Sequence, residues 1–277
     1  MKKINKKYLY IFLVVLMFIP LSGCSKIDNL KVKMGLKNND FDYMTENKVD
    51  KIVIQSNRDP RFRFVVTDKG TIQDLHKILS EAKVANEKTS LEPDYIFEIH
   101  QNDETVIKFN YVVGLQEKKQ GNFYNDDKAY VVSKRIDNDI IRNLSTLTKP
   151  RKFEELYYDT ILKFIDKYGD SFDTNKKIGI NISDDVEVLK YVLSTDLEYF
   201  KDRLNDKLPN AEVVNKNKND FDILVNVKTY GYKTTIYKSI ITLQDKSNNT
   251  ENKYYVLCNY EDNSWSIDVS KEKPEGF

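Results

Sequence analysis

The stretch "KPRKFEELYYDTILKFIDKYG", residues 149–169, decides how this chain of 277 residues is organised. Its apolar side chains recur every three or four residues and predict a helix over residues 153–168. One face of that helix is apolar along its whole length: Phe153, Leu156, Tyr157, Ile161, Phe164, Ile165 and Tyr168. Pro150 ends any helix that precedes it, and Gly169 suits the C′ position after the helix. We therefore expect a domain boundary at Pro150 and a long helix that a sheet must cover.

The residues after this helix predict a short strand, a second helix and then four strands. "KIGINIS" (177–183) alternates like a strand, and "DDVEVLKYVLSTDLEYFKDRL" (184–204) has a helical period. Asp184 and Glu187 have capping-box spacing, which places the helix start there. The four strand-like runs cover residues 221–231, 234–245, 252–260 and 264–270, and residues 215–220 read as a solvated hairpin tip. Helices first and antiparallel strands last predict an α+β domain over residues 150–277.

Two of these strands offer apolar faces that could cover the helix 153–168. Their inward residues are Phe221, Ile223, Val225 and Val227 in one strand, and Trp265, Ile267 and Val269 in the other. The last two runs, joined by "EDN", resemble the closing hairpin of NTF2-like domains, with Trp265 and Ile267 in that family's Trp-x-Ile strand. The resemblance covers residues 152–270 and implies an NTF2-like or cystatin-like cone of helix and sheet.

The first half of the chain predicts a similar α+β unit over residues 47–149. "VDKIVIQS" (49–56) and "RFRFVVTD" (61–68) form a hairpin across "NRDP", and residues 94–113 and 122–133 form two more. A helix over residues 70–84 has Ile72, Leu75, Leu79 and Ala82 on one face, and a closing helix over 135–147 has Ile136, Ile140, Leu144 and Leu147. This order, with "KVDKIVIQS" and "TIQDLHKIL", resembles the YhfM-like domain of Firmicute lipoproteins over residues 47–148. The family supplies no catalytic residues.

Residues 1–23 have the composition of an export signal. Lys2, Lys3, Lys6 and Lys7 precede the apolar run "YLYIFLVVLMFIPLSG" (8–23), which is shorter than the about 20 residues that span a bilayer. A positive start, a short apolar run and small residues at its end are typical of a signal peptide that is cleaved. The polar residues 24–46 that follow read as a tether to the folded body.

The motif "LSGC" (21–24) resembles the lipobox of bacterial lipoproteins. The resemblance implies that the Cys24 thiol carries a diacylglyceryl lipid of the palmitate type and that Cys24 becomes the N-terminus. Two acyl chains hold a protein stably on a membrane. We therefore expect a protein anchored through Cys24 on the extracytoplasmic face of the cell membrane. The alternative is an uncleaved membrane anchor with an incidental cysteine.

Composition limits the remaining function classes. The formal charge is +1 for the whole chain and becomes −3 once residues 1–23, with four lysines and no acids, are removed. This near-neutral balance argues against nucleic acid as a partner. Abundant Lys, Asn, Ile and Tyr suggest an AT-rich, Gram-positive source. With Cys24 lipidated, Cys258 has no cysteine to pair with, and its place on an apolar strand face predicts a buried, inert thiol.

Motifs for chemistry are scarce. His76 and His100, the only histidines, lack the spacing of a metal site. "YGDSFD" (168–173) contains a Gly-Asp-Ser triplet seen in one esterase group, but no histidine follows near the end of the chain, so a helix end and a turn explain it better. The acidic pairs at 126–127 and 184–185 read as a turn and a helix start. We expect no catalytic, cofactor-binding or metal-binding residue.

Aromatic residues leave one question open. The chain holds 18 tyrosines and 14 phenylalanines, which either fill the cores or line a groove for a glycan or a lipid. Tyr230, Tyr232 and Tyr255 are the residues for which this choice is least clear. The favoured function is a non-enzymatic binding or structural role toward an envelope protein or wall component. The alternative is a hydrolase acting on the cell wall, with a carboxylate site assembled by the fold.

Overall fold

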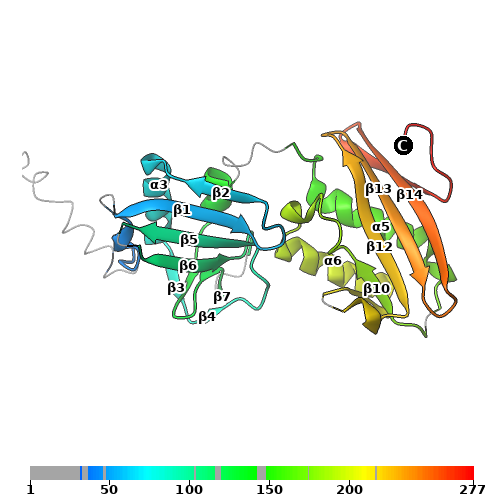
Figure 1. Cartoon of the computed structure of the whole chain (residues 1–277), viewed down its shortest axis with the longest axis horizontal. Helices are drawn as coiled ribbons and strands as arrows, with labels where there is room; N and C mark the ends of the chain where they lie inside the picture. The colour runs from blue at the N-terminus through cyan, green and yellow to red at the C-terminus, as the bar shows by residue number, and fades with distance from the viewer. Residues whose placement is uncertain are drawn as a thin grey trace, which may run out of the picture.

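The computed structural model describes Val32 and residues 37–45, 48–102, 104–115, 120–141, 148–173, 175–215 and 217–277. The expected signal peptide, Cys24, most of the expected tether, and Leu144 and Leu147 of the expected closing helix lie outside these residues. Within them, two sheets with separate hydrophobic cores lie side by side along the long axis of the molecule (Figure 1). The chain is α+β, as the sequence predicts.

The N-terminal domain is built on a seven-stranded antiparallel sheet in the order β2-β1-β5-β6-β8-β9-β3. Its strands are β1 (Val49–Ser56), β2 (Arg63–Val66), β3 (Lys83–Ala85), β5 (Tyr95–Gln101), β6 (Val106–Tyr111), β8 (Phe123–Tyr124) and β9 (Ala129–Val131). The three predicted hairpins are present. β3 was not predicted, because Lys83 and Val84 were assigned to the end of the helix 70–84. A small parallel pair, β4 (Glu87–Lys88) with β7 (Gln120–Gly121), was not predicted either, because strands of two residues have no period.

Helix α3 (Lys69–Ser80) packs against this sheet. The Asp68 side chain accepts a hydrogen bond from the backbone N–H of Thr71 and so caps the helix start. Ile72, Leu75 and Leu79 of the predicted face are buried in the core that the sheet forms, together with Ile78, which was not predicted. The helix ends at Ser80 and not at residue 84, so Ala82 joins this core from the segment after the helix. Ile136 and Ile140 enter the same core from a π-helix, η3 (Ile136–Ile141), where an α-helix was expected.

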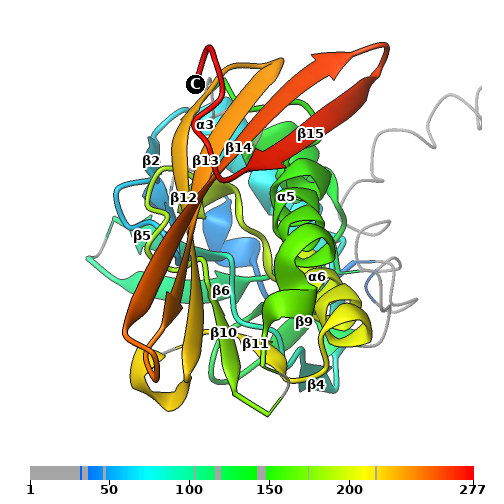
Figure 2. The ribbon, with the colours of Figure 1, turned by 90° about the vertical axis from the view of Figure 1, so that its right-hand side faces the viewer.

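The C-terminal domain carries a six-stranded sheet in the order β11-β10-β12-β13-β14-β15. Its strands are β10 (Ile178–Asn181), β11 (Ala211–Val213), β12 (Ile223–Tyr232), β13 (Ile236–Asp245), β14 (Thr250–Glu261) and β15 (Ser264–Ser270). β12 to β15 form the predicted antiparallel meander, whereas β10 pairs in parallel with both β11 and β12. Helix α5 (Phe153–Tyr168) lies along one face of the sheet, and α6 (Ser194–Lys207) lies next to it (Figure 2).

Helix α5 has the predicted bounds and is buried against the predicted strand faces. Ile223, Val225, Val227 and Val269 are buried in the same core as α5, and Trp265 and Ile267 pack against it partly exposed. Phe221 is the exception among these inward residues. It precedes β12 and packs with Val214 and Leu224 in a small separate cluster. Gly169 has φ −62° rather than a left-handed conformation, because the chain continues from it into a 3-10 turn, η4 (Gly169–Ser171).

The predicted start of the second helix was wrong by ten residues. α6 begins at Ser194, and Asp184 caps no helix; instead, its carboxylate contacts Asn181 and Lys218. The intervening segment forms turns and a short 3-10 helix, η5 (Leu189–Tyr191), because the N-terminal domain binds it, as described below. The expected hairpin tip at 215–220 was also wrong. The strands on either side, β11 and β12, both pair with β10 and not with each other, so they do not form a hairpin.

Candidate functional site

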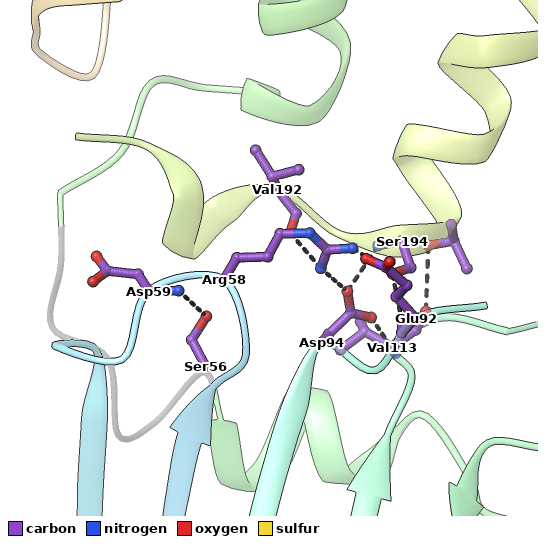
Figure 3. A network of polar contacts seen from close by, with 9 residues as sticks. Ser56, Arg58, Asp59, Glu92, Asp94, Val113, Val192 and Ser194 are labelled. Carbon is purple, nitrogen blue, oxygen red and sulfur yellow. Dashed lines mark hydrogen bonds and ion pairs between the residues drawn. The ribbon is translucent and has the colours of Figure 1, made fainter. Parts of the chain in front are cut away.

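The two domains meet where three loops of the N-terminal domain face the segment that leads into α6. The loops contribute Arg58 from the β1–β2 turn, Asp94 from the residues before β5, and Val113 from the end of β6 (Figure 3). The facing segment contributes Val192 and Ser194. Arg58, Asp94 and Ser194 point toward one another, and we refer to these three residues as the interdomain latch.

Asp94 is the centre of the latch. Its side chain is 1% exposed, and its Oδ1 accepts hydrogen bonds from Arg58 Nη1 at 2.6 Å and from the Ser194 backbone N–H at 2.7 Å. Its Oδ2 accepts a third bond from the backbone N–H of Val113 at 2.8 Å. Burial raises the pKa of Asp94, while Arg58 and the two backbone donors act in the opposite direction. One carboxylate therefore holds together two loops of its own domain and the start of α6.

The hydroxyl group of Ser194 is committed to structural partners. Arg58 Nη2 donates to Ser194 Oγ at 2.5 Å, and Oγ donates its own proton to the Glu92 carbonyl oxygen at 2.6 Å. A serine nucleophile needs a base that accepts the hydroxyl proton, and here a carbonyl oxygen holds that proton. The geometry of the latch is that of a joint between domains.

Further contacts extend the joint on both sides of the latch. Arg61 Nη2 donates to the Val186 carbonyl oxygen at 3.0 Å, and Thr195 Oγ1 donates to the Val113 carbonyl oxygen at 3.3 Å. The Leu193 side chain packs against the core of the N-terminal domain. Residues 186–195 are thus shaped by the other domain, which accounts for the late start of α6.

A hollow of about 220 Å³ opens beside the latch, between the two domains. Its floor is apolar and comes from the C-terminal domain, whereas Arg58 and Glu92 of the N-terminal domain and Asn215 stand at its rim. The floor residues are Ile182, Leu189, Val192, Leu197, Val213 and Val214. A second hollow of about 220 Å³ shares Arg58, Glu92, Leu197 and Asn215 with the first and reaches Lys201 on α6. We refer to the two together as the interdomain groove.

The residues that the sequence singled out lie elsewhere. His76 is on α3 and His100 on β5, and burial lowers the pKa of His76. Asp126 and Asp127 occupy the β8–β9 turn, where Asn125 Oδ1 accepts from the Asp127 backbone N–H. Among the described residues, no three His, Cys, Asp or Glu side chains are grouped so that they could hold a metal ion.

Cys258 is fully buried on the inner face of β14, and burial raises the pKa of its thiol to about 12. The prediction of a buried thiol is confirmed. Within the part of the chain that the structure describes, no helix is long and apolar enough to cross a membrane.

Comparison with known proteins identifies the first half of the chain. A family model described as YhfM protein matches residues 45–150. The N-terminal domain is YhfM-like. The matched range runs from just before β1 to Pro150 and ends before α5 begins. No curated protein and no solved structure gives a significant match to the chain.

The YhfM-like domain contributes residues to the groove that the sequence analysis overlooked. Arg58 was treated as part of a turn, since "NRDP" has the composition of a loop and nothing local reveals its partner 36 residues away. Ser194 was placed in the middle of a helix. One signal could have corrected that placement: Thr195 and Glu198 also have capping-box spacing, within two residues of the actual helix start.

The three tyrosines left open by the sequence differ in their surroundings. Tyr232 is the last residue of β12 and packs against the core, with its hydroxyl 3.4 Å from that of Tyr191. Tyr230 is 58% exposed, and Tyr255 is half-buried on the sheet face opposite α5. Tyr232 therefore belongs to the edge of the core, whereas Tyr230 and Tyr255 lie on the opposite face of the sheet.

Proposed function

We propose that this protein is a lipid-anchored lipoprotein of the extracytoplasmic face of the cell membrane with a non-enzymatic binding role at the cell envelope. The YhfM-like and C-terminal domains together form its ligand site, the interdomain groove. The ligand is an envelope protein or a wall component, and Cys24 carries the lipid.

The groove is the observation that supports binding. It has an apolar floor and a rim with a few polar groups, as ligand sites usually have. Its rim is held in place by the latch, in which each polar atom of Arg58, Asp94 and Ser194 that faces the joint has a hydrogen-bond partner. A preformed site of this kind loses little entropy when it binds a ligand.

The arrangement of the latch favours binding over hydrolysis. General acid–base catalysis needs a group that can release and take up a proton next to the substrate. The carboxylate of Asp94 is enclosed by Arg58, Val113 and Ser194, and the Ser194 proton is bound to a carbonyl oxygen. The latch therefore offers a substrate neither a free carboxylate nor an activated hydroxyl.

Site-specific photo-crosslinking in whole cells tests the ligand site. A p-benzoylphenylalanine in place of Leu197, on the groove floor, should form a covalent adduct with the envelope ligand. The same residue at Tyr199 is the matched control, because Tyr199 lies on the same helix and is 66% exposed. Equal adduct yields from the two positions would contradict a ligand in the groove.

Mass spectrometry of the native N-terminal peptide tests the anchor. Cys24 should carry a diacylglyceryl group as the first residue, and a Cys24→Ala protein should accumulate as unprocessed precursor. Cys258→Ala is the control and should be lipidated normally. An unmodified peptide that begins upstream of Cys24 would show that there is no lipid anchor.

A further inference from the structure

The sheet face opposite α5, which we call the outer face, carries an aromatic site that is separate from the interdomain groove. Val227 on β12, Ile241 on β13 and Val256 on β14 point inward to the core. The residue next to each of them along its strand therefore points outward. Lys228, Ile240 and Tyr255 are neighbours across β12, β13 and β14 on this face. Tyr230 is the most exposed aromatic residue there, at 58%.

A bulge in β12 shapes the backbone at this point. Thr229 pairs with Ser239 and Gly231 pairs with Lys238, so Tyr230 is the extra residue between two paired ones. Bulges bend a strand and redirect a side chain, and they are frequent next to functional sites. A Cβ atom on Gly231 would meet nothing within 4 Å, so the space beside Tyr230 is open.

This open space is a hollow of about 510 Å³. Tyr230 and Ile240 supply apolar surface, and the charged side chains of Glu187 and Lys228 also line the hollow. The site thus combines one exposed aromatic ring with a cation and an anion within the same concave surface. If Tyr230 and Ile240 only packed against each other, no charged side chains would be needed around the hollow.

The chain itself places a ring on Tyr230. The Phe277 ring is stacked on it with centroids 4.9 Å apart and planes 29° apart, and it meets Tyr255 edge-on at 5.2 Å. Gly276, at φ +81°, lets the last residues turn back so that the Phe277 backbone N–H donates to the Pro274 carbonyl oxygen. Lys238 Nζ donates to the Gly276 carbonyl oxygen at 2.6 Å and holds this turn on the outer face.

We propose that Tyr230 and the hollow beside it bind a pyranose ring of a glycan, and that Phe277 covers the aromatic surface until the glycan displaces it. A pyranose ring has an apolar C–H face that can stack on tyrosine and hydroxyl groups around its edge. Lys228 supplies donors and Glu187 supplies acceptors for those hydroxyls. The Phe277 ring covers a face of the Tyr230 ring and is not among the residues that line the hollow.

The lining of the hollow favours a glycan over the aromatic side chain of a protein partner. Buried aromatic anchors in protein interfaces fill desolvated pockets with depleted charge. Here Glu187 and Lys228 face the open space and would lose water without compensation against an apolar side chain. Sugar hydroxyls replace that water. The proposal does not depend on the interdomain groove.

Isothermal titration of the full-length protein in detergent with chitohexaose, an N-acetylglucosamine hexamer, tests the proposal. Phe277→Ala should lower the dissociation constant about two- to tenfold, since a stacked aromatic contact is worth about 0.5–1.5 kcal/mol. Tyr230→Ala should raise it at least about tenfold, whereas Tyr230→Phe keeps the ring and should retain binding. Tyr199→Ala removes an exposed tyrosine elsewhere in the same domain and should change nothing.

Two results would overturn the proposal. One is the absence of saturable binding of either chitohexaose or cellohexaose, a neutral glucose hexamer, by the Phe277→Ala protein. The other is binding that Tyr230→Ala leaves unchanged while its thermal unfolding stays that of the parent. If a tyrosine–serine hexapeptide bound the Phe277→Ala protein and neither sugar did, the site would be a protein-binding site and the glycan proposal would be wrong.

Discussion

The two domains use their buried carboxylates in opposite ways. Among the described residues of the YhfM-like domain, the buried carboxylates are Asp59 and Asp94, and both lie in loops that face the C-terminal domain. In the C-terminal domain the buried carboxylate is Asp185, inside the fold. It accepts hydrogen bonds from the Thr229 backbone N–H at 2.9 Å, the Thr229 hydroxyl at 2.8 Å and the Tyr157 hydroxyl at 3.1 Å.

This difference means that Asp94 positions one domain on the other, whereas Asp185 holds together elements of a single domain. Asp94 forms an ion pair with Arg58 of its own domain, and both residues hydrogen-bond to Ser194 of the other domain. Asp185 is satisfied by neutral donors from α5 and β12, and burial raises its pKa. In the YhfM-like core the Phe123 ring contacts both Phe97 and Phe109. The comparison predicts that latch mutations uncouple the domains, whereas Asp185 mutations affect one domain.

The largest effect is expected for Asp94→Ala. It leaves the Arg58 guanidinium in the joint without its partner and removes the acceptor of two backbone N–H groups. Breaking a buried ion pair in this way costs about 3–5 kcal/mol, which urea unfolding followed by circular dichroism would measure. Asp126→Ala, in an exposed turn, is the control and should cost less than about 0.5 kcal/mol. A loss as small as that of the control would mean that the latch contributes little.

A smaller effect is expected inside the C-terminal domain. Asp185→Ala leaves Thr229 and Tyr157 donors unsatisfied and should lower the free energy of unfolding by about 2 kcal/mol. Asp185→Asn keeps an acceptor and removes the buried charge, so it should be at least as stable as the parent at pH 7. If Asp185→Asn were as damaging as Asp185→Ala, the charge itself would be required and the contrast with Asp94 would disappear.

Lowering the pH from 7 to 5 should raise the free energy of unfolding through Asp196. Burial, together with the nearby carboxylates of Glu154 and Asp94, raises the pKa of Asp196 to about 6. A folded-state pKa above the unfolded value means that stability is gained as the pH falls through about 6. We expect a gain of about 1 kcal/mol between pH 7 and pH 5. Asp196→Asn should reduce this gain in urea unfolding at the two pH values, although Asp94 and Asp185, whose pKa values burial also raises, remain. An unchanged gain would assign it to another group.

The smallest effect is expected at the linker. Trp265 Nε1 donates to the Arg151 carbonyl oxygen at 2.8 Å, and the Arg151 guanidinium lies 5.2 Å from the centre of the Tyr260 ring. Trp265→Phe keeps an aromatic ring and removes the donor, at a cost of about 0.5 kcal/mol. Limited proteolysis should then cut faster within residues 148–152. Tyr260→Phe keeps the ring under Arg151 and should leave the cleavage rate unchanged; equal acceleration in both variants would contradict the role of the Trp265 hydrogen bond.

Local sequence patterns predicted most helices and strands. The start of α6 and the groove depend on contacts between residues far apart in the sequence, which such patterns do not contain. Helix α5 has the expected bounds because its apolar stripe extends over four turns and is followed directly by a turn. The start of α6 was misplaced because Asp184 and Glu187 fit a cap locally, whereas residues 186–195 are held by the other domain. The groove was not predicted at all, since its walls come from Arg58, Leu197 and Val213, which share no sequence motif.

The hydrogen bond from Ser194 to Asp94 also bears on the order of folding, because the two residues are 100 positions apart in the sequence. Three hairpins of the YhfM-like sheet, β1–β2, β5–β6 and β8–β9, close short loops and form fast. The pairing of β1 with β5 and of β3 with β9 completes the sheet without any residue of the C-terminal domain. The bond between Asp94 and Ser194 closes a long loop and needs α6 to have emerged. We therefore expect the first domain to complete its own fold while Arg58 and Asp94 are still exposed to water. Docking of the second domain then becomes the last step of maturation, and the groove comes into existence only with that step.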